Sequence, residues 1–377
     1  NEKYGWWSET GKITTADGSK NVTFFHMSDP QSQNVRQYER SWVNVLKTAF
    51  EKYPNASFIM NTGDLVDHGD NNHQWQYMFD TASKYLMNTY MMPLSGNHEG
   101  KGTNATVNYF TLPNVPEQNT ESGVYYSFTY NNVHFAVLNS NDLDEKTNGL
   151  SEKQIEWLKA DMNASDAQWK FVALHKSPYS QGSHYKDKDV CAIREQLSVL
   201  MPELSIDMVF AGHDHVYLRT ASLINNEKVS TDITYLKKDG DIYKTQVTPS
   251  GTTYLITGCA GVKTYIQNDA SKTDKYFPRG EKVFSLDLPM FASIEIEDGV
   301  LYMNAYGVDK NGAQNVDRFA IQKDKTQGEV VPDYKEAEEE VKNDEIKNFF
   351  NTFFEYLVKI FKVIINIFKI YILRVDL

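Results

Sequence analysis

Short apolar runs alternate with helix-spaced apolar stripes over the first 220 residues of the chain. Val22–Ser28 and Ser57–Thr62 are runs of the kind that forms buried strands. Arg36–Tyr53 repeats its large apolar residues every three or four positions, which predicts a helix packed on one face. A second helix is predicted around Trp75–Tyr90. Because strands and helices alternate in this way, we expect a layered α/β domain.

The pattern changes to mainly strands between residues 221 and 323. Phe291–Ile296 and Leu301–Tyr306 are separated by Asp298-Gly299, a pair that favours a tight turn between antiparallel strands. We expect these strands to belong to a second sheet that completes the same domain. One domain over residues 21–323 is therefore predicted.

The end of the chain has another composition. Residues 324–348 are highly charged and predict a solvated linker. Residues 349–377 are nearly all apolar apart from a few polar residues spaced four and three apart, which form one narrow stripe on a helix. Lysine in the middle of a bilayer is costly, so this amphipathic helix fits the membrane interface better than a membrane crossing. Self-association, or folding back onto the domain, is the alternative. The polar positions are Asn348, Thr352, Glu355, Lys359, Lys362, Asn366 and Lys369.

Composition excludes some classes of function. The chain has 377 residues, 41% of them hydrophobic, which is ordinary for a globular protein with a large core. Its net charge of −12 argues against nucleic acid as a main partner, because neutralising phosphates needs a basic face. The two cysteines cannot form a disulfide framework. The chain begins with Asn rather than Met, so we expect that a leader or upstream region precedes it.

Five short polar clusters stand immediately after strand-like runs. In an open α/β sheet the loops at the carboxyl ends of strands face one crevice, so residues in such loops come together. Their carboxylates, amide oxygens and imidazoles suit divalent metal ions, and no thiolate is among them. The clusters are Asp29-Pro30-Gln31, Gly63-Asp64-Leu65-Val66-Asp67, Gly96-Asn97-His98-Glu99, Leu174-His175 and Gly212-His213-Asp214-His215.

The order of these clusters resembles the calcineurin-like metallophosphoesterase superfamily, and within it the purple-acid-phosphatase-like branch. The resemblance runs from about Trp7 to Lys323 and implies a four-layer α/β/β/α sandwich. Gly5–Ser8 resembles the end of an N-terminal module common in the branch, so residues 1–20 are expected to be the end of that module and a linker.

Carried over position by position, the resemblance implies two divalent metal ions (Mn, Fe or Zn). The first would be bound by Asp29, Gln31, Asp64 and His215. The second would be bound by Asp64, Asn97, His175 and His213. Asp64 would bridge the ions, and a bridging hydroxide would attack phosphorus. Two dications, two carboxylates and a hydroxide leave a net charge of about +1 facing the phosphate.

Further residues have weaker assignments. His98 would face the substrate and act with Asn97 in catalysis, while Asp214 would have a supporting role. His184 and Arg219 are candidates for contacting the substrate phosphate, against an ordinary loop histidine and an ordinary ion pair. His26 lies within a strand pattern and is expected in the core.

Two positions depart from the family pattern. Gln31 stands where many members have His, and an amide oxygen is a harder ligand, so we expect less preference for zinc in the first site. Asp67 stands where purple acid phosphatases have a tyrosine ligand. The iron-loaded protein should therefore lack a strong visible absorption band.

The predicted activity is metal-dependent hydrolysis of phosphate monoesters, similar to that of acid phosphatases. A phosphodiesterase or nucleotide hydrolase using the same metal pair is the first alternative. A surface-bound interaction module with a vestigial metal site is the second. The expected location is extracellular or at the cell surface, with the 349–377 segment contacting a membrane surface or another copy of the chain.

Overall fold

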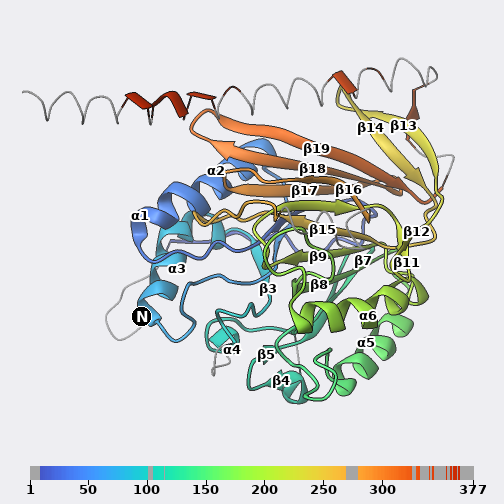
Figure 1. Cartoon of the computed structure of the whole chain (residues 1–377), viewed down its shortest axis with the longest axis horizontal. Coiled ribbons are helices and arrows are strands. Elements are labelled where there is room, and N and C mark those ends of the chain that lie inside the picture. Colours follow the sequence, from blue (N-terminus) through green and yellow to red (C-terminus); the bar gives the residue numbers. More distant parts are fainter. Residues whose placement is uncertain are drawn as a thin grey trace, which may run out of the picture.

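Two mixed β-sheets face each other in the computed structural model (Figure 1). The structure describes residues 9–100, 105–113, 115–268, 279–324 and 328–331, together with scattered positions between 339 and 365. The nine-stranded sheet has the order β20-β13-β14-β19-β18-β17-β1-β2-β3. The seven-stranded sheet has the order β16-β10-β15-β9-β8-β7-β6.

The strands of the nine-stranded sheet are β1 Val22–Met27, β2 Phe58–Asn61, β3 Tyr90–Pro93, β13 Asp232–Lys238, β14 Asp241–Val247, β17 Met290–Glu297, β18 Val300–Asp309, β19 Gly312–Gln322 and β20 Glu329–Val330. Those of the seven-stranded sheet are β6 Tyr126–Tyr130, β7 Val133–Val137, β8 Trp169–Lys176, β9 Met208–Gly212, β10 Tyr217–Thr220, β15 Thr253–Thr257 and β16 Gly280–Phe284. Two small ribbons pair β4 Asn119–Thr120 with β5 Gly123–Val124, and β11 Leu223–Ile224 with β12 Glu227–Lys228.

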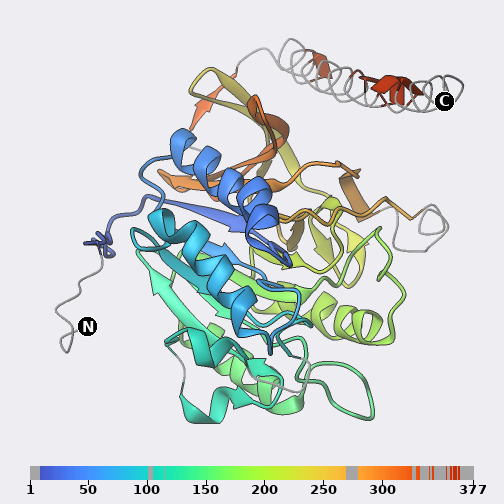
Figure 2. The same ribbon diagram turned by 90° about the vertical axis from the view of Figure 1, so that its left-hand side faces the viewer.

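Helices cover the outer face of each sheet, as Figure 2 shows from the side. The helices are α1 Val35–Tyr38, α2 Asn44–Lys52, α3 Asn72–Leu86, α4 Ala105–Tyr109, α5 Glu152–Ala164 and α6 Lys188–Glu203. Apolar residues of α2 and α3 pack on the outer face of β1 and β2, whereas α5 and α6 pack on β7, β8 and β9. The layers are therefore helix, sheet, sheet and helix.

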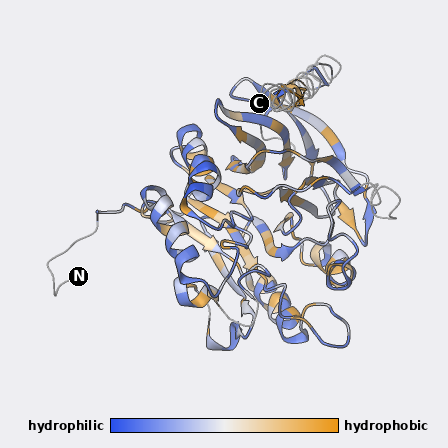
Figure 3. Cartoon of the chain, turned by 60° about the vertical axis from the view of Figure 1, so that its left-hand side comes forward, coloured by the Kyte–Doolittle hydropathy of each residue, from blue (hydrophilic) through white to orange (hydrophobic). Residues whose placement is uncertain are grey.

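The strand alternation explains how the core is divided. Phe24 lies between the sheets with Phe58, Phe135 and Phe171, whereas the next residue, Phe25, points outward to the helices. Successive side chains on a strand point to opposite faces, and both faces are covered here, so apolar residues occupy both faces of β1. In Figure 3, hydrophobic residues (orange) are frequent on the strands, and hydrophilic residues (blue) are frequent on the outer helices.

Several expectations from the sequence are confirmed. The helix predicted over Arg36–Tyr53 is present, although a π-helical segment, Glu39–Val43, separates α1 from α2. The turn predicted at Asp298-Gly299 joins β17 to β18. His26 is fully buried in β1. One boundary is wrong: the helix predicted to reach Tyr90 ends at Leu86, and Tyr90 begins β3, which pairs in parallel with β2.

Residues 9–20, predicted as a linker, contain no helix or strand. Most of the predicted charged segment 324–348 and of the predicted amphipathic helix 349–377 lies outside the described residues. Scattered positions between 354 and 365 are helical. Within the part of the chain that the structure describes, no helix combines the length and the apolar character needed to cross a membrane.

Candidate metal centre

The polar clusters lie at the carboxyl ends of neighbouring parallel strands, most of them in the loops that follow, with His175 still inside β8. Strands β1, β2 and β3 are adjacent in one sheet, and β8 and β9 are adjacent in the other. The loops after β1 and β2 are bonded to each other, because the backbone N–H of Asp29 donates to the Gly63 carbonyl at 3.0 Å and that of Gln31 donates to the Asp64 carbonyl at 3.0 Å. The sheet edges therefore bring together residues that are far apart in the sequence.

Three of the predicted ligands have an unusual backbone conformation. Asp29 and Asp64 each have φ of 51°, and His213 has φ of 73°. Non-glycine residues seldom adopt this left-handed region, and where they do the conformation is often linked to function. The sharp turns direct all three side chains into the same space instead of along their strands.

Two glycines allow the loops to approach closely. A Cβ atom on Gly96 would lie 2.1 Å from Asp64 Oδ1, and one on Gly212 would lie 1.9 Å from the Ser28 hydroxyl oxygen. Since carbon atoms cannot approach oxygen so closely, any side chain at these positions would push the loops apart.

Asp64 is at the centre of the first group of donors. Its Oδ2 lies 3.3 Å from His175 Nε2, and Asp64 is 2% exposed. One donor atom from each of Asp64, His175 and His213 can be chosen so that all three lie within 4.8 Å of one another. Asn97 Oδ1 lies 3.0 Å from the same His175 nitrogen. These four residues, from both sheets, form a compact set of oxygen and nitrogen donors.

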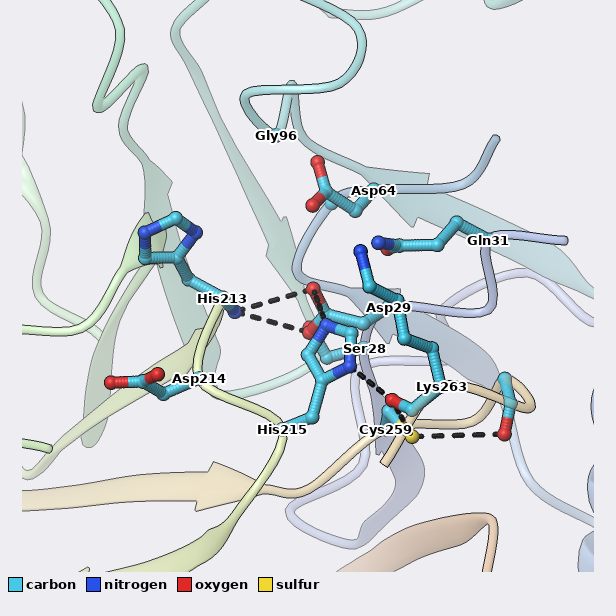
Figure 4. A network of polar contacts seen from close by, with 12 residues as sticks. Ser28, Asp29, Gln31, Asp64, Gly96, His213, Asp214, His215, Cys259 and Lys263 are labelled. Atoms are coloured by element: carbon cyan, nitrogen blue, oxygen red, sulfur yellow. Dashed lines mark hydrogen bonds and ion pairs between the residues drawn. The ribbon is translucent and has the colours of Figure 1, made fainter. Parts of the chain in front are cut away.

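Asp29 is at the centre of the second group. Its Oδ1 lies 3.2 Å from His215 Nε2, and its Oδ2 accepts a hydrogen bond from the His213 backbone N–H at 3.1 Å. Gln31 is buried beside it, and its Oε1 has no hydrogen-bond partner among the described residues. Figure 4 shows the side chains of Asp29, Gln31 and Asp64 directed toward one another. An orphaned buried amide oxygen is costly unless something binds it.

Hydrogen bonds to backbone carbonyls set which nitrogen of each histidine faces the centre. His175 Nδ1 donates to the Thr62 carbonyl at 2.8 Å, His98 Nδ1 donates to the Asp67 carbonyl at 2.6 Å, and His215 Nδ1 donates to the Lys263 carbonyl. Such bonds fix the tautomer and leave the lone pair on Nε2. The imidazoles are therefore oriented with Nε2 toward the carboxylates, as metal-binding histidines are.

Electrostatics at the centre are dominated by the two carboxylates. Burial disfavours the charged imidazole of His175, but the Asp64 carboxylate outweighs burial and raises the pKa of His175 to about 9. Likewise, Asp29 outweighs burial at His215 and raises its pKa well above the usual value. A metal cation would compete with these protons, so binding should weaken as the pH falls.

Two buried acids support the loops from behind. Glu99 accepts backbone hydrogen bonds from Asp64 and Gly96 at 2.9 Å and from Val66 at 3.2 Å. Asp214 accepts from the backbone N–H groups of Ser183 at 2.9 Å and His184 at 3.1 Å, and thereby holds the loop that follows β8. Asp214 points away from the donors in Figure 4. Both carboxylates thus act on the backbone.

The remaining predicted contacts are found in different places. His184 lies at the mouth of the centre, with its ring centroid 4.1 Å from that of His213. His98 Nε2 lies 3.7 Å from Asp64 Oδ2. Arg219 is in β10, where its guanidinium donates to both carboxylate oxygens of Asp317 at 2.7 and 3.1 Å. The arginine is therefore already engaged.

Sequence reasoning missed two residues of the loop after β15. The ring of Tyr265 stacks on His215 with centroids 4.2 Å apart and planes 9° apart. The side chain of Lys263 rises past Asp29 toward Gln31 in Figure 4. Nothing in the local pattern identifies this loop, because it reaches the centre through contacts between distant segments: the pairing of β15 with β9 and β10, and the hydrogen bond of His215 to the Lys263 carbonyl.

The donor set fits a pair of divalent ions. Asp29, Gln31 and His215 form one side of the cluster and Asn97, His175 and His213 the other, with Asp64 between them. Oxygen and imidazole donors without thiolate suit Mn, Fe or Zn. The Gln31 oxygen, which has no partner among the described residues, and the Nε2 atoms that face the carboxylates suit such ions.

The fold and this donor cluster together define a class of protein, the metallophosphoesterases. Residues 22–217, more than half of the chain, match the calcineurin-like phosphoesterase family, and the chain belongs to that family.

Similarity to individual proteins is more distant. Purple acid phosphatase 23 of Arabidopsis thaliana is 31% identical over 144 residues, which cover 36% of this chain and 30% of that protein. An uncharacterized protein of Mycobacterium tuberculosis is 28% identical over 186 residues, covering 44% of this chain and 35% of that protein. The matched segments thus span about a third of each curated relative's length.

A solved structure shows the same fold. The purple acid phosphatase PPD1 from yellow lupin (Lupinus luteus) seeds superposes with a TM-score of 0.65, covering 82% of this chain and 55% of that one. At 18% identity this likeness concerns the fold alone.

Proposed function

We propose that the chain is a dinuclear-metal phosphoesterase that hydrolyses phosphate monoesters. The observation that carries the proposal is the orientation of the histidines. His175 and His215 each donate Nδ1–H to a backbone carbonyl and direct Nε2 at the carboxylates of Asp64 and Asp29. Two buried carboxylates that face imidazole nitrogens form a site in which divalent ions can take the place of protons.

The proposed residues divide between the ions and the substrate. Asp29, Gln31, Asp64, Asn97, His175, His213 and His215 would hold the two ions. A bound pair of divalent ions supplies the Lewis acidity that phosphate-ester hydrolysis needs. His98 has Nδ1–H fixed on the Asp67 carbonyl, and its Nε2 lies 3.5 Å from Gln31 Nε2. Only when His98 also carries a proton on Nε2 would that nitrogen donate to a phosphoryl oxygen or to the leaving group.

Hydrolysis of two matched esters tests this function. The chain would be stripped of metal, reloaded with Mn²⁺, Zn²⁺ or Fe²⁺, and given an aryl phosphate monoester and the corresponding diester. We expect metal-dependent turnover that favours the monoester. Preference for the diester would select the phosphodiesterase or nucleotide hydrolase instead.

Variants connect the activity to the centre. Asn97→Ala removes a proposed ligand and should lower turnover by at least about a hundredfold. Asn163→Ala, on the exposed face of α5, is the matched control and should leave turnover unchanged. Failure of the wild-type chain to bind any metal would exclude the proposal and leave an interaction module.

The tail is the basis of a second proposal, about location. Helical positions Phe354, Val358, Phe361 and Ile365 recur at helical spacing and are 64%, 50%, 62% and 50% exposed. We propose that the 349–377 segment lies on an anionic membrane surface and keeps the enzyme at the exterior of the cell. Co-sedimentation with anionic liposomes should be lost when residues 349–377 are removed. Unchanged sedimentation would exclude the segment as the cause.

A further inference from the structure

His213 has histidine neighbours on two sides. Its ring lies 4.9 Å from that of His175 inside the centre and 4.1 Å from that of His184 at the mouth. Donor atoms of His213, His184 and Asp187 can be chosen so that all lie within 4.8 Å of one another, as is also true of His213, His175 and Asp64. One imidazole is therefore shared by two possible ligand sets.

Asp187 adopts an orientation that its position does not explain. It is the N-cap residue of α6, where an aspartate normally accepts a hydrogen bond from the first turn of the helix. Its side chain makes no such bond. Its Oδ2 instead lies 2.7 Å from His184 Nδ1. The carboxylate is thus directed at the mouth of the centre.

The loop that presents His184 is held firmly. The buried carboxylate of Asp214 accepts from the His184 backbone N–H, from Ser183 and from the Ser180 hydroxyl. The mouth is also open, because the side chains of His184 and Asp187 are 32% and 49% exposed. An ion from solvent can reach these donors without any opening of the core.

We infer that His184, Asp187 and His213 form a third, inhibitory metal site for Zn²⁺ at the mouth of the centre. Two imidazoles and one carboxylate are a donor set that zinc prefers and magnesium does not. The site takes His213 from the proposed second ion, because a neutral imidazole has one lone pair for coordination. The inhibitory role rests on the proposed function, whereas the binding of Zn²⁺ at this site does not.

Calorimetric titration tests the site without any reference to activity. The chain loaded with two equivalents of Zn²⁺ should show one further, weaker binding event. Asp187→Asn keeps the size of the side chain and its ability to cap α6, and should weaken that event at least about tenfold. His184→Gln should do the same. Asp166→Asn, at an exposed loop position, is the control and should leave the event intact.

Turnover provides the second measurement. Zn²⁺ in excess should slow aryl phosphate hydrolysis by about tenfold in the wild-type chain but not in Asp187→Asn, each compared with its own rate at two equivalents. Excess Mg²⁺ should have no such effect. Absence of the third event, or its persistence in both variants, would overturn the site. A third event in a chain that hydrolyses no ester would instead overturn the proposed function and keep the site.

Discussion

Asp317 and Asp64 are buried carboxylates in two different regions of the sandwich. Asp317 lies within β19, where Arg219 donates two hydrogen bonds and the Tyr217 hydroxyl donates a third at 2.7 Å. Asp64 lies in a loop at the sheet edge, where its nearest cationic partners are histidines, at 3.3 and 3.7 Å. The Asp317 carboxylate is paired with an arginine, whereas the Asp64 carboxylate is paired with His175, an imidazole that can lose its proton.

Two fully buried histidines show the same difference. His26, in the strand region, has hydroxyl neighbours, Thr62 at 3.1 Å and Thr257, and burial lowers its pKa to about 3. His175, near the carboxyl end of β8, is equally buried, but Asp64 outweighs burial and raises its pKa to about 9. Burial alone therefore does not identify a functional residue. The two histidines differ in whether a carboxylate lies beside them.

The largest expected effect is that of removing the Asp64 charge. Asp64→Asn should abolish binding of the metal pair and lower turnover by about a thousandfold or more, since both proposed sites use this carboxylate. Metal content per chain and hydrolysis of an aryl phosphate are the measurements. A variant that retains two ions and normal turnover would show that Asp64, like Asp317, has no role in metal binding or catalysis.

Breaking the internal pair should affect folding instead. Arg219→Met leaves Asp317 buried without its cation and should cost about 3–5 kcal/mol of unfolding free energy. The double variant Arg219→Met/Asp317→Leu should recover much of that loss, because no uncompensated charge remains. Urea unfolding measures both. A fall in kcat/KM per folded molecule would contradict a purely structural role for the Arg219–Asp317 pair. It would instead support Arg219 as a contact of the substrate.

The pH dependence of stability should report His26. Its folded pKa of about 3 lies below the unfolded value of 6.5, so between these pH values only the unfolded chain binds the proton. Stability is therefore lost as the pH falls from about 6.5 toward 3, by about 1.4 kcal/mol per pH unit. His26→Asn should reduce the slope of the unfolding free energy against pH by about 1.4 kcal/mol per pH unit in this range. Equal slopes would mean that His26 does not carry this effect.

The smallest expected effect concerns metal preference. Gln31→His replaces an orphaned amide oxygen with an imidazole and should raise the affinity for Zn²⁺ relative to Mn²⁺ by about tenfold. Competitive titration with Mn²⁺ followed by electron paramagnetic resonance measures the ratio. An unchanged ratio would indicate that position 31 is not a ligand, even though its side chain is buried beside Asp29.

Much of the fold was predictable because its signals are local. The alternation of Phe24 and Phe25 between two apolar faces and the turn at Asp298-Gly299 are properties of neighbouring residues. The helix was predicted to extend to Tyr90 because β3 follows soon after α3. A strand of four residues is too short to show a change in the spacing of apolar residues.

The sequence by itself determined the layered α/β class and predicted which residues would be donors, since the polar clusters stand at the ends of apolar strands, which meet on one side of the sheets. Only the tertiary structure decided how those donors are used. The direction of His175 Nε2 toward Asp64 depends on the carbonyl of Thr62. The stacking of Tyr265 on His215 depends on strand pairing, and the direction of Asp187 depends on His184. The physical reason is the distance along the sequence over which each property is set. Apolar periodicity depends on neighbouring residues, whereas hydrogen-bond partners and charge compensation depend on contacts between distant segments.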